Sequence, residues 1–218
     1  TEVNEKRENS RSLPGYQIHE NVYATTDIQA AVESSSVVFV AVPSAFFRTV
    51  VQRLAPIIRP DALLVSTTKG IEAGTFLLMS QVMQQELPEA TIGVLSGPNL
   101  AREIAQQSLT GTVIASPDES VRERVREMMR SEYFRVYTNN DMYGVELGGS
   151  LKNIYAIIAG LASAMGMGHN TNAMLVTRSL TEMARFGREL GADPMTFLGL
   201  SGVGDLIVTC SSSLSRNF

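Results

Sequence analysis

The sequence predicts an α/β protein: a doubly wound parallel sheet followed by an all-helical domain. Over the first two thirds of the 218 residues, strand-like apolar runs alternate with helix-like segments. This alternation is typical of a parallel sheet with helices on its faces. From about residue 141 onward the patterns are helical. We therefore expect a sheet domain over residues 1–140 and the start of a helical domain over residues 141–218.

The predicted strands are short runs rich in β-branched residues. The first is SVVFVAV at 36–42, a continuous apolar run as in strands buried on both faces of a sheet. The later strands are expected at 62–66, 92–95, 112–115 and 133–137.

Helices are predicted from apolar residues that recur at helical spacing. Residues 44–58 are the clearest case, with Phe47, Val51 and Leu54 on one face. The other helices of the first domain are expected at 75–87, 99–106 and 117–130. The second domain is expected to contain helices at 142–167 and 170–190, and we interpret the short apolar run at 206–208 as helical.

Three tight turns follow predicted strands: Pro43-Ser44, Thr68-Lys69-Gly70 and Ser96-Gly97-Pro98-Asn99. In open α/β sheets, ligands bind at the carboxyl ends of the strands. We expect these turns to line one crevice.

The composition narrows the class of protein. A net charge of −4 argues against nucleic acid or an anionic membrane as the main partner. The longest apolar stretch, 154–167, is shorter than the about 20 residues of a membrane span. With one cysteine and two distant histidines, the chain lacks a disulfide framework and the spacing of a metal site. The polar segment 1–11 is no signal peptide, so we expect a cytoplasmic protein.

Lysine usage points to candidate catalytic residues. Lys6, Lys69 and Lys152 stand against fifteen arginines. Lys69 follows a strand and Lys152 lies in an apolar helix, and burial lowers the pKa of a lysine toward neutrality. Such a lysine can act as an acid or a base. The alternative is a buried stem whose ammonium group reaches water.

Two glycine-containing segments could contribute to a binding site. One stands directly before Lys152, and the other carries Arg216. Gly148 and Gly149 each cost a helix roughly 1 kcal/mol, which favours a close approach of backbone or ligand beside Lys152; tight helix packing is the alternative. The second segment runs from the Gly202–Asp205 turn to Ser215, Arg216 and Asn217. An arginine fork suits a phosphate group, although an ordinary polar turn has the same composition.

From Asn9 to Asn217 the chain resembles the bacterial-type NAD(P)-dependent glycerol-3-phosphate dehydrogenases. The matching stretches are VAVPS at 40–44, TTKGIE at 67–72, VLSGPNLAREI at 94–104, FRVYTNND at 134–141, GVELGGSLKNIYAIIAG at 144–160, TRSLTEM at 177–183 and GVGDLIVTCSSSLSRN at 202–217. Together these stretches are highly specific, whereas each alone is modest.

The resemblance implies a Rossmann-like domain followed by a helical domain like the C-terminal domain of 6-phosphogluconate dehydrogenase. It implies interconversion of sn-glycerol 3-phosphate and dihydroxyacetone phosphate with NAD or NADP, which supplies phospholipid synthesis. It assigns Lys152 as the proton acceptor. The implied substrate contacts are Lys69, Gly97, Asn99, Lys152, Asp205, Ser215, Arg216 and Asn217. The implied cofactor contacts are Pro43, Lys69, Ala101 and Arg216. The family usually has Ser or Thr where this chain has Asn99.

The resemblance also implies a fragment. No GxGxxG occurs, and the family's first strand and glycine-rich turn would precede residue 1. Later helices of the second domain are missing as well. We therefore expect this chain alone to bind NADH poorly, and the family suggests a homodimer. Two other functions stay open: a related 3-hydroxyacid or ketopantoate-type dehydrogenase, and a truncated, non-catalytic module.

Overall fold

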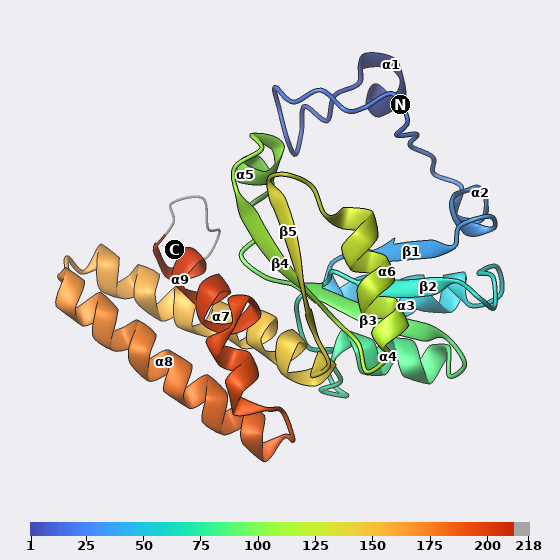
Figure 1. Cartoon of the computed structure of the whole chain (residues 1–218). Helices are drawn as coiled ribbons and strands as arrows, with labels where there is room; N and C mark the ends of the chain where they lie inside the picture. Colours follow the sequence, from blue (N-terminus) through green and yellow to red (C-terminus); the bar gives the residue numbers. More distant parts are fainter. Residues whose placement is uncertain (212–218) are drawn as a thin grey trace.

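The computed structural model describes residues 1–211, which form a five-stranded sheet with helices on both faces and a helical part beside it (Figure 1). The strands lie side by side in chain order. They are β1 (Val37–Val40), β2 (Leu63–Ser66), β3 (Thr91–Ser96), β4 (Thr110–Ala115) and β5 (Phe134–Asn139). The predicted fold class, a Rossmann-like sheet followed by helices, is confirmed.

The sheet departs from the prediction in the direction of one pair. β1–β2, β2–β3 and β4–β5 are parallel, but β3 and β4 are antiparallel, with Val94 opposite Ala115. Parallel strands need a crossover that returns the chain to the starting edge. The connection here holds only the short helix α5 (Ala101–Ala105), so β4 runs back along β3. The expectation of an entirely parallel sheet was wrong at this pair.

Helices cover the two faces of the sheet. On one face α3 (Ser44–Leu54) and α4 (Met79–Glu86) pack against β1 and β2, with Phe47, Val51 and Leu64 fully buried. On the other face α6 (Glu119–Met129) packs against Val65 and Ile114. Two short helices, α1 (Glu2–Lys6) and α2 (Ile28–Val32), precede the sheet.

Of the predicted helices, α3 and α4 fall furthest short of their expected lengths. α3 ends at Leu54, and residues 55–58 form turns. The helix expected over 75–87 begins only at Met79, because Gly74 and Phe76 adopt positive φ angles of 89° and 60° that no α-helix accommodates. The prediction rested on the apolar stripe through Leu78, Val82 and Met83, but the chain is not helical over residues 75–78.

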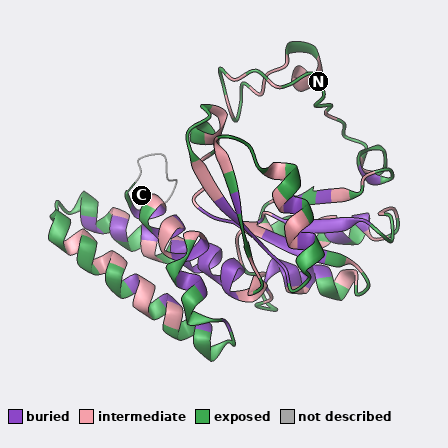
Figure 2. Cartoon of the chain, viewed as in Figure 1, coloured by how far each residue is buried: buried purple, intermediate pink, exposed green. Residues whose placement is uncertain are grey.

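The helical part is built on the long helix α7 (Met142–Ala164), which Asp141 caps by accepting from the Gly144 N–H. α8 (His169–Glu189) runs beside α7, and the short helices η1 (Pro194–Leu198) and η2 (Leu200–Gly204) lead to α9 (Asp205–Ser211). Figure 2 shows that α7 is buried at the end against the sheet and exposed toward its far end. Within residues 1–211, no helix is long and apolar enough to cross a membrane.

Candidate active site

The turns after the parallel strands β1, β2 and β3 meet at the carboxyl ends of these strands. A Cβ on Gly70 would lie 2.8 Å from Oγ of Ser44, so these turns are in contact. Lys69 Nζ donates to the carbonyl oxygen of Gly97 at 3.1 Å. The three predicted turns thus lie together, as expected, although no cavity lined by all three is found among the described residues. Pro43 is exposed at the same end of the strands, immediately before α3.

Gly97 needs the conformational freedom of glycine. Its φ is +156°, and a Cβ there would lie 3.1 Å from Cα of Thr112 in the neighbouring strand. This close fit brings the Gly97 carbonyl within reach of Lys69. A side chain at this position would push the turn away from the lysine.

Asp205, the first residue of α9, joins two lysines from distant parts of the sequence. Its carboxylate is 2% exposed and accepts from Lys152 Nζ on one oxygen and from Lys69 Nζ on the other. Two ammonium groups therefore share one buried carboxylate. When both lysines are protonated, the cluster carries one net positive charge, which suits an anionic or polarised ligand.

The environment of Lys152 holds the pKa of its ammonium group closer to neutrality than that of an exposed lysine. Its side chain is 9% exposed, so the ammonium group does not reach open water. Burial and, to a lesser extent, the nearby charge of Lys69 lower the pKa of Lys152 to about 8, with Asp205 opposing the shift. The alternative of a lysine that extends its charge into water is wrong for Lys152.

The paired glycines of α7 permit close contacts on two sides. A Cβ on Gly148 would lie 2.7 Å from the carbonyl oxygen of Ser201 in η2. A Cβ on Gly149 would lie 2.6 Å from Oγ of Ser96 and 3.5 Å from Cγ of Lys69. The predicted close approach is confirmed: α7 packs against a backbone on one side and against the Lys69 stem on the other.

Thr209 belongs to this cluster, and the sequence prediction missed it. Its hydroxyl accepts from Lys152 Nζ at 2.7 Å and donates to the carbonyl oxygen of Asp205 at 2.6 Å. A signal was present in the sequence, because Thr209 stands four residues after Asp205 and so shares its helix face. Lys152 is thereby held by two groups of α9.

Asn99 and Ala101 occupy the β3–β4 connection. The Asn99 amide donates to the carbonyl oxygen of Gly111 and accepts from the Thr112 hydroxyl, which fixes its side chain against β4. Ala101 is exposed at the start of α5. Beside them is a cavity of about 540 Å³ lined by Thr67, Lys69, Leu95, Asn99, Ile104, Met129 and Phe134.

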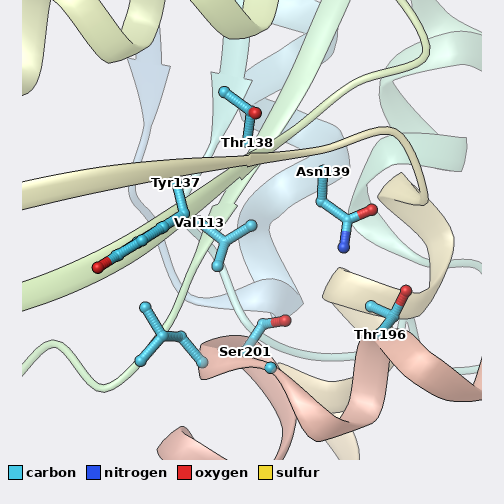
Figure 3. Close-up of a pocket in the computed structure, with 8 residues that line it drawn as sticks. Val113, Tyr137, Thr138, Asn139, Thr196 and Ser201 are labelled. Atoms are coloured by element: carbon cyan, nitrogen blue, oxygen red, sulfur yellow. The ribbon is translucent and has the colours of Figure 1, made fainter.

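A second cavity, of about 300 Å³, lies between β4–β5 and the η1–η2 region (Figure 3). It is lined by Val113, Tyr137, Thr138, Asn139, Thr196, Gly199, Leu200 and Ser201, all uncharged. None of the predicted site residues is among them. Ser215, Arg216 and Asn217, the predicted phosphate clamp, lie outside the described residues.

Comparison with known proteins agrees with this architecture. The family model described as the N-terminus of NAD-dependent glycerol-3-phosphate dehydrogenase matches residues 1–122, and the model of its C-terminus matches residues 141–218. The glycerol-3-phosphate dehydrogenase (NAD(P)+) of Saccharophagus degradans is 57% identical over 97% of this chain and 59% of its own length. That of Alcanivorax borkumensis is 55% identical over 99% of this chain and 63% of its own length.

Solved structures give the same family. The crystal structure of glycerol-3-phosphate dehydrogenase from Coxiella burnetii is 38% identical, with a TM-score of 0.95 over 99% of this chain and 66% of that one. The structure of DsGPDH from Dunaliella salina is 31% identical, with a TM-score of 0.93 over 99% of this chain and 37% of that one. The chain spans about three fifths of the length of its curated relatives. It belongs to the NAD-dependent glycerol-3-phosphate dehydrogenase family.

Proposed function

We propose that this chain carries the proton-transfer centre of an enzyme that interconverts sn-glycerol 3-phosphate and dihydroxyacetone phosphate with NAD or NADP. The observation that carries the proposal is the pair Lys69 and Lys152 on the single buried carboxylate of Asp205. The relatives' names supply the reaction, and this cluster supplies the groups that the reaction needs. The whole enzyme is expected in the cytoplasm, as a homodimer, where its product feeds phospholipid synthesis.

Three features of the carboxyl ends of the strands support a dinucleotide site there. α3 begins directly after Pro43, which provides no side-chain cap for its first turn, and free N–H groups at a helix start favour an anion. Lys69 is 28% exposed and, with Asn99, lines the cavity of about 540 Å³. Pro43, Lys69, Ala101 and Arg216 would hold the cofactor here. When bound, NAD(P) exchanges a hydride with carbon 2 of the substrate.

Lys152 has the central role in proton transfer. In the reduction of dihydroxyacetone phosphate, its ammonium group gives a proton to the carbonyl oxygen that becomes the alcohol. In the oxidation of glycerol 3-phosphate, its neutral amine removes that proton. Lys69 adds a second positive charge that stabilises the negative charge developing on this oxygen. Asp205 and Thr209 keep Nζ of Lys152 in one place throughout.

The substrate phosphate requires groups of its own. We propose that Arg216 and Asn217 bind the phosphate and that Ser215, Gly97 and Asn99 contact the rest of the substrate. A guanidinium group binds two phosphate oxygens with parallel hydrogen bonds and stays charged at every relevant pH. This clamp favours a phosphorylated substrate over the unphosphorylated 3-hydroxyacids or ketopantoate of related dehydrogenases.

A substrate comparison tests the proposed function. The protein to use is the full-length form, which is this chain joined to the N- and C-terminal segments that complete its relatives. The absorbance of NADH or NADPH measures the rate. We expect rapid oxidation of the cofactor when dihydroxyacetone phosphate is the substrate, and little when dihydroxyacetone or ketopantoate replaces it. Equal rates with and without the phosphate group, or no reaction with dihydroxyacetone phosphate, would refute the proposal.

A further inference from the structure

Glu146 is a buried carboxyl group that the proton transfer does not use. It lies on α7, six residues before Lys152, and is 2% exposed. Its carboxylate accepts from the Ser80 N–H at 3.0 Å, from the Ser80 hydroxyl and from the Met79 N–H. Within residues 1–211 its partners are thus the first two residues of α4 rather than a lysine or an arginine.

A buried carboxyl group without a cationic partner lowers the stability of the fold. Burial without a cation raises the pKa of Glu146 to about 7, although the hydrogen bonds from Ser80 and Met79 oppose the shift. An apolar side chain of similar size would fill the same space without this cost. What the carboxyl group adds is a fixed position. Hydrogen bonds depend on direction, so they hold α7 at one place along α4, whereas apolar contacts would allow it to slide.

The segment that Glu146 contacts begins at Lys69. From Lys69 the chain runs through a closed loop, in which Ile71 pairs with Leu78, and enters α4 at Met79. α7 binds this segment at both ends. Ser150, one turn beyond Glu146, accepts from the Gly70 N–H at 3.0 Å, and Glu146 binds Ser80.

Glu72, in the middle of the segment, is held by the helix α3. Arg48 of α3 donates to both carboxylate oxygens of Glu72, at 2.8 and 2.7 Å. Lys69 thus starts a segment that is tied to α7 at its two ends and to α3 in between. A shift of α7 along α4 would move Lys152 relative to Lys69.

We propose that Glu146 is a positioning residue: by docking on the start of α4 it fixes the segment 69–80 against α7 and so sets how closely Lys69 and Lys152 approach across Asp205. The inference rests on the proposed function, since it concerns the same two lysines. It gives a measurable signature, because the charge of Lys69 is one cause of the lowered pKa of Lys152. If Lys69 moves away, the pKa of Lys152 rises toward 10.5.

The test follows Lys152 directly by NMR. The chain has three lysines, so selective ¹³C labelling of lysine gives three side-chain signals to titrate. We expect Glu146→Ala to raise the pKa of Lys152 from about 8 toward 10.5. Glu146→Gln should keep it near the wild-type value, because the amide still accepts from the Ser80 N–H and donates to the Ser80 hydroxyl. Glu189→Ala, at an exposed site on α8, is the matched control.

Kinetics of the full-length form supply the second readout. For Glu146→Ala we expect kcat for dihydroxyacetone phosphate reduction to fall by roughly tenfold or more, since small misplacements of catalytic groups are costly. The KM for NADH should stay unchanged, and Glu146→Gln should restore kcat. A merely structural role would lower the thermal midpoint without shifting the pKa of Lys152, and that result would overturn the inference.

A milder variant covers the case in which Glu146→Ala does not fold. Ser80→Ala removes one hydroxyl and leaves the backbone N–H, so we expect a smaller shift of the Lys152 pKa in the same direction. Ser163→Ala, an exposed position on α7, is its control. No shift in Ser80→Ala would overturn the inference. A wild-type protein without dehydrogenase activity would refute the proposed function, while the NMR titration would still decide the role of Glu146.

Discussion

Replacement of Lys152 by methionine is expected to lower kcat of the full-length form by roughly two to four orders of magnitude, the usual contribution of a general acid–base group. Methionine keeps most of the length and the apolar stem but can neither give nor take a proton. Asp205 keeps Lys69 as its partner in this variant, so its charge stays balanced. The loss should therefore reflect chemistry rather than unfolding.

Rates in both directions, with dihydroxyacetone phosphate and with glycerol 3-phosphate, measure this effect. Lys6→Met is the matched control, since Lys6 is exposed at the end of α1. The KM for NADH should be similar in the two variants and the wild type. A Lys152→Met enzyme that keeps more than about a tenth of the wild-type kcat would exclude Lys152 as the proton-transfer group.

Asp205→Asn is expected to have the largest effect on stability and a strong effect on rate. The substitution leaves two ammonium groups next to each other without the carboxylate that both contact. Removal of one partner from a buried ion pair typically costs about 3–5 kcal/mol. The pKa of Lys152 should also fall below about 8, because Asp205 is the group that opposes its lowering.

Denaturant unfolding of the chain measures the stability change, and the same variant in the full-length form gives the rate. Asp61→Asn is the control: Asp61 pairs with Arg59 at the surface with 67% of its side chain exposed, and such exposed pairs contribute little to stability. If Asp205→Asn were no more destabilising than Asp61→Asn, Asp205 would not be the shared counterion of the two lysines.

The strands were predictable from the sequence, whereas their direction was not. SVVFVAV and the later β-branched runs could be recognised because buried strands need continuous apolar faces. Nothing in such a run encodes whether it lies parallel or antiparallel to its neighbour, so the reversal of β4 was missed. The late start of α4 was missed for a similar reason: the positive φ of Phe76 is imposed by the loop and contradicts the residue's own preference.

The site was partly predictable for a different reason. Lys69 and Lys152 stood out because lysine is rare in this chain, and the structure brings both to Asp205. Thr209 was missed although its spacing from Asp205 places the two on one helix face. Glu146 did not stand out, since a single glutamate in a helix has the same sequence signature whether it is buried or solvated. Their importance depends on contacts between segments distant in the sequence, and these appear only in the fold.

The pH dependence of glycerol 3-phosphate oxidation by the full-length form tests the central claim most directly. Oxidation needs the neutral amine of Lys152, so kcat/KM should rise with pH and level off above a pKa of about 8. Reduction of dihydroxyacetone phosphate needs the ammonium form and should decline through the same pKa. An oxidation profile that keeps rising to the ordinary lysine pKa of 10.5, or one without an ascending limb, would contradict the assignment of Lys152 as the buried base.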